Sequence, residues 1–508
     1  MIRALTAALM IATPVAAQSP AAATTPAAAG AASGAVSVQA IEPRATAVFD
    51  AWMREAHVPG LVYGIVKDGQ LVLVRGLGVQ DTASKRPVKA DSLFRIASMS
   101  KAFTALAILK LRDEGRVSLE ASAETYVPEM RGWRYPTTDS RRVRVADLLH
   151  HSAGFVEDNP WGDRQQPLSE AGFTAMLKAG VPFAQAPGLR MEYSNFGYAT
   201  LGRIVSNVSG QRYQDYIRSE IMTPLGMTAT GYDVLRVAQA GRALGYRWQD
   251  ERWVREPDMA DGAFGAMGGV QTSANDYWRW VAYLLSGWPA RYGADAGPVK
   301  RATLREIVEG SNFVTVQERR RADGSICRVP SAYAMGWSVV EDCDRGRIVQ
   351  HSGGYPGYGS IVMLLPDAGV GVFAFANRTY AAPSQPVSQV LLILREAGLA
   401  VDRTVPVSPD LARAYGVAQQ VWRTGSLDAA PLAENVALDR DLAQRRRDIA
   451  ELKQQVGTCR TDAPIAPVSA MEGRFRWSCE RGTVAGRVQR APMPALSLQV
   501  LAFEAAPQ

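Results

Sequence analysis

The chain passes from an extended to a helical pattern within residues 92–106, SLFRIASMSKAFTAL. Residues 92–97 read as a short extended segment, and apolar residues then recur with helical spacing to about residue 114. Ser98 is followed three positions later by Lys101, and none of the other seven lysines has a serine at that distance. The stretch therefore predicts a strand that leads directly into a helix, with Ser98 at the helix start.

Ser98 and Lys101 are suited to nucleophilic catalysis if the stretch is helical. Residues three apart share one face of a helix, with Cβ atoms about 5–6 Å apart. A serine hydroxyl becomes a useful nucleophile when a neighbouring group takes its proton, and burial lowers a lysine pKa enough for this task. The helix N-terminus also favours negative charge near Ser98. On this motif alone, a capping serine beside a surface lysine is an equally good interpretation.

Two further short motifs follow, Tyr193-Ser194-Asn195 and His351-Ser352-Gly353. Taken singly, each has a structural explanation. Tyr193 is one of 17 tyrosines, and a lone tyrosine usually packs with its hydroxyl satisfied. A lone histidine is more often structural than catalytic, and the glycines after His351 could form a loop. The order of all three motifs along the chain is what favours a shared site.

The rest of the pattern predicts an α/β (α+β) fold. A hairpin is expected from strands 62–66 and 71–74 with an Asp-Gly turn, and a second from strands 361–365 and 370–375. Residues 120–310 are mostly helical in pattern, and strand character returns at 333–377. We therefore expect one antiparallel sheet built from distant parts of the chain, flanked by helices and carrying an inserted all-helical lobe.

The composition divides the chain into four parts. Residues 1–17 resemble a secretory signal peptide with cleavage after Ala17, and residues 18–41 form an Ala/Pro-rich spacer. Residues 42–400 are the expected catalytic domain. Residues 401–508 are the expected C-terminal appendage, helical and then a small β unit. These features predict a periplasmic or secreted protein without a membrane span.

Four cysteines agree with export. Their spacing suggests the bridges Cys327–Cys343 and Cys459–Cys479, although four cysteines allow three pairings. With no CxxC motif and only four histidines, no metal site and no cofactor is expected.

The charge balance does not favour nucleic-acid binding. There are 56 Lys+Arg against 49 Asp+Glu, giving +7, and the longest basic runs are three arginines each. Runs of this length are more typical of a solvated surface. We therefore expect a small ester, peptide or amide as the partner and no nucleic acid.

In order and approximate spacing, the three motifs resemble those of the penicillin-recognising serine hydrolases. The similarity is greatest to the branch of class C β-lactamases, D,D-peptidases, D-aminopeptidases and related esterases. It covers roughly residues 45–395. Its supporting segments are 148–154 (LLHHSAG), 187–188 (PG), 224–227 (PLGM) and 268–273 (GGVQTS).

The resemblance implies a role for each motif residue. Ser98 would be the acylated nucleophile, Lys101 would assist proton transfer, and Tyr193 would be the general base, with a pKa lowered by nearby cations. Asn195 would bind the substrate and Lys101. The backbone N–H groups of Ser98 and Gly354 would form the oxyanion hole. The remaining expected substrate and oxyanion residues are His351, Ser352 and Gly353.

One departure narrows the expected activity. True β-lactamases of this class have a similar third motif, but with a lysine in the place that His351 holds here. A lysine is a permanent cation for the substrate carboxylate, whereas histidine is mostly neutral near pH 7. We therefore expect a carboxylesterase, D-aminopeptidase or D,D-peptidase-like enzyme with weak or no β-lactamase activity. We further hypothesise that activity changes as His351 titrates.

Three rival interpretations remain. A penicillin or wall-peptide sensor would be acylated at Ser98 without turnover. A conventional α/β-hydrolase is disfavoured because the nearest candidate elbow, residues 350–354 (QHSGG), lacks its first glycine. An inactive scaffold is disfavoured because all three motifs are intact.

Overall fold

The computed structural model of the protein describes residues 37–321 and 323–506. The predicted signal peptide and most of the predicted spacer lie outside these residues. None of the described helices combines the length and the apolar character needed to cross a bilayer.

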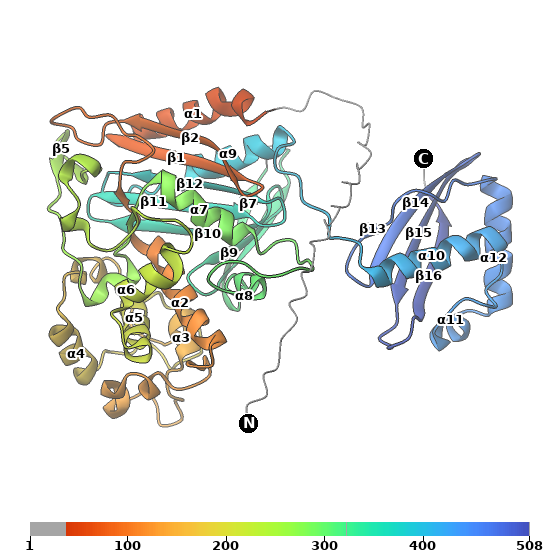
Figure 1. Ribbon diagram of the computed structural model, residues 1–508, viewed down its shortest axis with the longest axis horizontal. Helices are drawn as coiled ribbons and strands as arrows, with labels where there is room; N and C mark the ends of the chain where they lie inside the picture. The colour runs from red at the N-terminus through yellow and green to blue at the C-terminus, as the bar shows by residue number, and fades with distance from the viewer. Residues whose placement is uncertain (1–36, 322, 507–508) are drawn as a thin grey trace, which may run out of the picture. The chain divides into compact units, whose positions relative to one another are not determined.

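The central element is an eight-stranded antiparallel sheet with the strand order β2-β1-β12-β11-β10-β9-β8-β7 (Figure 1). Its strands are β1 (Gly60–Lys67), β2 (Gln70–Gly78), β7 (Asn312–Arg320), β8 (Ile326–Tyr333), β9 (Ser338–Asp342), β10 (Gly346–Tyr355), β11 (Tyr358–Leu365) and β12 (Val370–Ala376). Both predicted hairpins are present, as β1–β2 and β11–β12. The sheet starts its C-terminal half at Asn312, earlier than predicted, because β7 is an edge strand whose mostly exposed residues show no alternating apolar pattern.

Local sequence and long-range pairing both shape this sheet. Asp68 and Gly69 have φ angles of 49° and 77°, and so form the tight turn that an Asp-Gly pair favours. Strand β1 then pairs with β12, with Leu61 opposite Ala376. Strands from distant parts of the chain therefore lie side by side in one sheet, as the sequence predicted.

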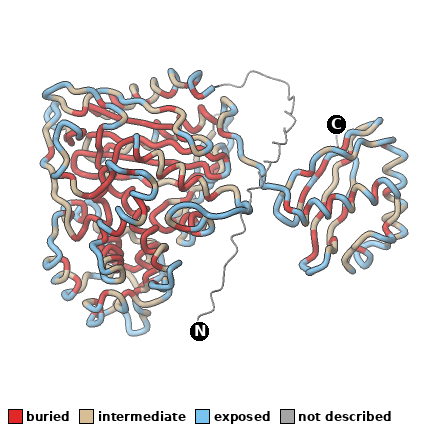
Figure 2. The backbone as a smooth tube through the Cα atoms, viewed as in Figure 1, coloured by how far each residue is buried: buried red, intermediate tan, exposed pale blue. Residues whose placement is uncertain are grey.

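Helices cover both faces of the sheet. Helices α1 (Val38–Glu55) and α9 (Ser384–Glu396) pack on one face, where Leu61 and Ile65 of β1 point. Val62 and Val66 point to the other face, toward α2 (Lys101–Asp113) and α7 (Ala274–Leu285). Figure 2 shows that the central strands are almost entirely buried, as two covering layers require.

Helix α1 begins inside the stretch assigned to the spacer. Ser37 caps it by accepting a hydrogen bond from the Ala40 N–H, and Val38, Ile41 and Ala45 are buried against the sheet. The folded region therefore starts before residue 42. The predicted start of the folded region is too late because the first turn of α1 directly follows the low-complexity tract.

A helical lobe is inserted between β2 and β7, in agreement with the expected architecture (Figure 1). It contains α3 (Val145–Leu149), α4 (Glu170–Ala179), α5 (Asn195–Ser209) and α6 (Tyr213–Ile217), and α8 (Arg301–Glu306) follows α7. Two small antiparallel pairs accompany these helices: β3 (Phe94–Arg95) with β6 (Gln271–Thr272), and β4 (Tyr246–Gln249) with β5 (Arg252–Arg255). The observed sheet, flanking helices and lobe confirm the predicted fold class.

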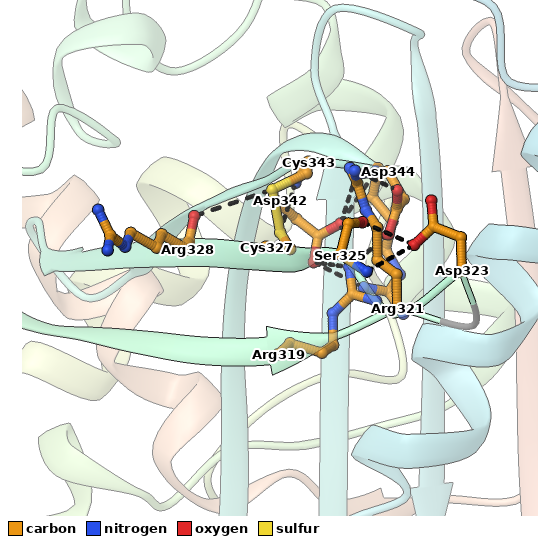
Figure 3. The surroundings of a disulfide bond; sticks show 10 residues. Arg319, Arg321, Asp323, Ser325, Cys327, Arg328, Asp342, Cys343 and Asp344 are labelled. Carbon is orange, nitrogen blue, oxygen red and sulfur yellow. Dashed lines mark hydrogen bonds and ion pairs between the residues drawn. A yellow bond between two sulfur atoms is a disulfide. The ribbon is translucent and has the colours of Figure 1, made fainter.

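The Cys327–Cys343 disulfide joins β8 to the turn after β9 (Figure 3). Arg319 on β7 pairs with both Asp342 (3.1 Å) and Asp344 (2.5 Å) in the same cluster. The bridge and the ion pairs therefore stabilise the β7–β8 end of the sheet, as the cysteine spacing suggested for this pair.

Residues 409–505 form a module with its own core. A four-stranded antiparallel sheet, in the order β13-β14-β15-β16, accompanies three helices. The elements are α10 (Pro409–Thr424), α11 (Glu434–Asp439), α12 (Leu442–Val456), β13 (Ala466–Pro467), β14 (Glu472–Cys479), β15 (Gly482–Arg490) and β16 (Leu498–Ala505). Trp422 and Trp477 are buried in this core. The second predicted bridge, Cys459–Cys479, is also present.

Candidate active site

Ser98 lies on a sharp turn between β3 and α2. A short 3-10 segment, Ala97–Ser100, precedes α2, and Ala97 has a left-handed φ of 49°. The Ile96 N–H donates to the Val270 carbonyl (3.0 Å), which fixes the chain just before the turn. A non-glycine residue in this conformation costs energy that the surrounding structure must offset, and such positions are concentrated at functional sites.

Lys101 is fully buried, and its amine faces Ser98. Its Nζ lies 3.1 Å from the Ser98 Oγ and donates to the Asn195 Oδ1 (2.7 Å) and the Met267 carbonyl (2.8 Å). Its exposed fraction is 0%. Burial lowers the pKa of Lys101 to about 7, and the nearby carboxylates of Asp163 and Asp158 partly oppose this shift. The alternative of a surface lysine beside a capping serine is therefore wrong.

Helix α5 delivers Asn195 to this lysine. The Asn195 amide donates to the Asn159 Oδ1 (2.8 Å) while its Oδ1 accepts from Lys101, so the amide orientation is fixed. Asp158 accepts from the backbone N–H groups of Asn195 and Phe196, both at 2.7 Å. A carboxylate at a helix N-terminus satisfies donors that have no partner within the helix.

Tyr193 precedes α5 and lines the same pocket as Ser98. Its ring lies 4.9 Å from the Lys101 Nζ. The expected lowering of its pKa is wrong. Burial of the hydroxyl raises the pKa of Tyr193, the neighbouring Ser98 hydroxyl lowers it only in part, and the carboxylates of Asp163 and Asp158 raise it further. Tyr193 is therefore protonated at neutral pH in the absence of substrate.

His351 of β10 borders the same site. Its Nδ1 lies 2.6 Å from the Ser352 carbonyl, so this nitrogen carries the proton and donates, while the Nε2 accepts from the Tyr333 hydroxyl at 3.0 Å. Burial, with a smaller effect from the Lys101 charge, lowers the pKa of His351 to about 4. The side chain is therefore uncharged at neutral pH.

The two glycines after Ser352 permit close packing. A Cβ on Gly353 would collide with the Ile96 carbonyl oxygen, and one on Gly354 would lie 2.8 Å from the Tyr380 ring. Ser360 also donates to the Ile96 carbonyl (2.8 Å). Strand β10 can therefore lie directly beside the turn that carries Ser98.

These groups line one pocket of about 410 Å³. Its lining residues are Ser98, Asn159, Pro160, Asp163, Tyr193, His351, Ser352, Gly354 and Tyr380. The structure thus gathers the predicted Ser98, Tyr193, His351, Ser352 and Gly354 at one cavity, with Lys101, Asn195 and Gly353 directly behind it. The four cysteines do not line this pocket.

Sequence reasoning missed Asp163, Tyr380 and His151. Asp163 and Tyr380 line the pocket, and the buried His151 accepts from the Ser194 N–H through its Nδ1 (3.1 Å), which orients the turn that carries Tyr193. The polar stretch at 157–163 (EDNPWGD), upstream of the Tyr193 motif, was an available signal for Asp163. No motif in the sequence around Tyr380 indicated that it would line the pocket.

Two curated proteins are similar to this chain in sequence. The staphylococcal protein flp (Staphylococcus aureus strain NCTC 8325) is 29% identical over 334 residues, which cover 64% of this chain and 61% of that protein. Penicillin-binding protein 4* of Bacillus subtilis strain 168 is 26% identical, over 59% of this chain and 64% of the relative. The match therefore spans about three fifths of the length of these curated relatives.

Two solved structures have the same fold. An octameric penicillin-binding protein homologue from Pyrococcus abyssi aligns with a TM-score of 0.60 and 20% identity, over 89% of this chain and 96% of that one. A class C β-lactamase from Rhodobacter sphaeroides aligns with a TM-score of 0.54 and 23% identity, over 69% and 99%. At these identities the likeness concerns the fold alone.

A family description named Beta-lactamase matches residues 45–394, which is most of the chain and includes all three motifs. This match agrees with the resemblance inferred from the motifs and with the two fold comparisons. The chain belongs to the β-lactamase family of serine hydrolases.

Proposed function

We propose that the protein is an exported serine hydrolase that forms an acyl-enzyme on Ser98 and cleaves ester or amide bonds in small molecules or peptides. One observation supports this most directly: the Nζ of a fully buried lysine lies 3.1 Å from the Ser98 Oγ. Burial lowers the pKa of that lysine to about 7, so a substantial fraction is neutral at physiological pH.

In the proposed acylation step, neutral Lys101 takes the proton of Ser98 as Oγ attacks the substrate carbonyl carbon. The bond to the leaving group then breaks, and Tyr193 gives its proton to the departing oxygen or nitrogen. Lys101 can return a proton to Tyr193. The raised pKa of Tyr193 suits a proton donor better than the base that the resemblance implied.

Deacylation would run the same proton transfers in the opposite direction: Tyr193 passes its proton to Lys101 and takes one from the water that attacks the acyl carbon, and Lys101 protonates the departing Ser98 Oγ. The negative oxygen formed in each step would be stabilised by the backbone N–H groups of Ser98 and Gly354, both of which border the pocket. Loss of one such donor typically slows a reaction by about 10²–10³. Asn195 would hold Lys101 in place; the expected contact of Asn195 with the substrate has less support, because its amide is buried and bonded to Lys101 and Asn159. No metal or cofactor takes part in this scheme.

The neutral state of His351 supports a preference for substrates other than β-lactams. A β-lactam carries a carboxylate beside its ring, and His351 offers no cation to meet it. The two disulfides support an oxidising compartment, since such bridges rarely persist in the bacterial cytosol.

The proposal can be tested with a chromogenic butyryl ester, a D-amino-acid anilide and a chromogenic cephalosporin, using Ser98→Ala and Lys101→Met as controls. We expect turnover of the ester or the anilide, and a mass increase of the acyl group on Ser98 in a quenched reaction. Activity that survives in Ser98→Ala would refute the mechanism. Stoichiometric acylation of Ser98 without turnover of any substrate would identify a sensor instead.

A further inference from the structure

Among the described residues that line the Ser98 pocket, Asp163 alone has a side chain that can carry negative charge at neutral pH, because burial raises the pKa of Tyr193 and of Tyr380 and keeps both protonated. Its exposed fraction is only 3%, although it borders the cavity. A buried carboxylate is costly unless a cation or several hydrogen bonds compensate for the lost water. The hydrogen-bond and ion-pair partners of Asp163 therefore show whether the protein itself supplies the compensating cation.

The partners of Asp163 are few. The Tyr380 hydroxyl donates to its Oδ2 (3.2 Å). Among residues 37–321 and 323–506, no lysine, arginine or histidine lies within ion-pair distance of it, that is, 4.0 Å. Burial raises the pKa of Asp163 to about 6, and the more distant cations of Lys101 and Arg164 oppose that rise. The carboxylate is thus largely ionised at neutral pH, although no described cation of the protein lies within ion-pair distance of it.

The loop that carries Asp163 is held firmly in place. Gly162 packs so closely on Asn195 that an added Cβ would lie 2.7 Å from the Asn195 Cβ. Asp158, at the start of the loop, caps α5 through two backbone N–H groups. Tyr380 holds the other side of the carboxylate and itself packs on Gly354. A ligand would therefore meet a preformed carboxylate.

We propose that Asp163 selects substrates that carry a protonated amino group close to the scissile carbonyl, such as amino-acid esters, amides or peptides with a free N-terminus. The ammonium group would supply the missing cation and donate hydrogen bonds to the carboxylate while Ser98 attacks the neighbouring carbonyl carbon. This inference rests on the proposed function of Ser98. It adds a substrate class to that function.

A different role for Asp163 makes a distinguishable prediction. If it acted only by stabilising the Lys101 cation, its removal would change the rate equally for charged and neutral substrates. Direct recognition changes the ratio between them. Hydrogen bonds to charged groups are stronger than neutral ones, so loss of the contact should cost about tenfold to a hundredfold for the charged substrate alone.

The test compares D-alanine 4-nitroanilide and D-alanine methyl ester with their N-acetyl derivatives, near neutral pH. For the wild type we expect kcat/KM to favour the free amine by about tenfold or more. In Asp163→Asn this preference should disappear, mainly through a higher KM for the free amine. The N-acetyl substrates should be cleaved at least as well as before. Glu157→Gln, an exposed carboxylate in the same loop, should retain the wild-type preference.

Four outcomes are decisive. A wild type that cleaves N-acetyl substrates as well as free amines overturns the inference and leaves the proposed function standing. An equal loss on both substrates in Asp163→Asn also overturns it. A wild type that cleaves none of the four, while Ser98 is not acylated, overturns both. If thermal unfolding shows that Asp163→Asn does not fold, Tyr380→Phe replaces it in the test. A weaker preference for the free amine than in the wild type then supports the inference. An unchanged preference overturns it.

Discussion

At the scale of single residues, burial moves the two groups beside Ser98 in opposite directions. It lowers the pKa of Lys101 to about 7 and raises that of Tyr193, because the charged form is a cation in one case and an anion in the other. The pair therefore contains a base and an acid at neutral pH. This assignment differs from that implied by the motifs, because the motifs specify which residues are present but not how deeply they are buried.

The pH dependence of the reaction follows from this assignment. In the proposed mechanism the active form needs neutral Lys101, so kcat/KM for a neutral ester should fall as the pH drops through about 7 and Lys101 becomes protonated. His351 has a pKa of about 4 and stays neutral over this range. A pH–rate profile of His351→Asn should therefore keep the same acidic limb. Disappearance of that limb in the variant would assign it to His351 instead.

The charge at position 351 should control β-lactam recognition. We expect wild-type kcat/KM for a chromogenic cephalosporin to lie well below that for a butyryl ester. His351→Lys should raise the cephalosporin value relative to the ester by about tenfold, because a cation can pair with the β-lactam carboxylate. His351→Gln is the matched neutral control and should not. Equal efficiency of the wild type on both substrates would contradict this view.

At the scale of elements, the sequence predicted what depends on short-range pattern. The Asp68-Gly69 turn and the alternating strands around it indicated the first hairpin, and the spacing of Ser98 and Lys101 placed both on one turn. Asp163 and Tyr380 were not predicted because they are 217 positions apart and meet only through the packing of the lobe against the sheet. The edge strand β7 was missed because its exposed residues carry no alternation.

Asp158 links one of these elements to the chemistry. Asp158→Ala removes the acceptor for two N–H groups at the start of α5, so unfolding in denaturant should show a loss of about 0.5–2 kcal/mol, the usual cost of a lost helix cap. Activity should fall as well, because Asn195 loses its fixed position beside Lys101.

Ser169→Ala is a matched control for this prediction. Ser169 caps α4 by accepting from the Gly172 N–H (3.1 Å), and it does not line the Ser98 pocket. The Ser169→Ala variant should lose a similar amount of stability and keep full activity. If both variants lose activity in proportion to stability, the capping of α5 has no separate catalytic consequence.

At the scale of the whole molecule, every residue placed at the pocket lies between Ser98 and Tyr380. The hydrophobic cores of the sheet and the lobe are built from residues 38–400, whereas the third core is built from residues 411–501. Arg403 still belongs to the first region, since it bonds to the carbonyls of Asp367 and Trp288. One set of core residues therefore ends at Ala400, and the next begins at Leu411.

Separate cores predict separate stability, so a chain that ends at Thr404 should fold and hydrolyse a small ester with kcat/KM within about twofold of the full chain. Far-ultraviolet circular dichroism and ester kinetics measure this. The full-length double variant Cys459→Ser/Cys479→Ser is the companion test. It should keep ester activity while its C-terminal module unfolds at lower denaturant concentration, because loss of a bridge of this span costs about 3 kcal/mol in the chain-entropy description. A shortened chain that folds but has lost its ester activity would show that the module contributes to the site itself.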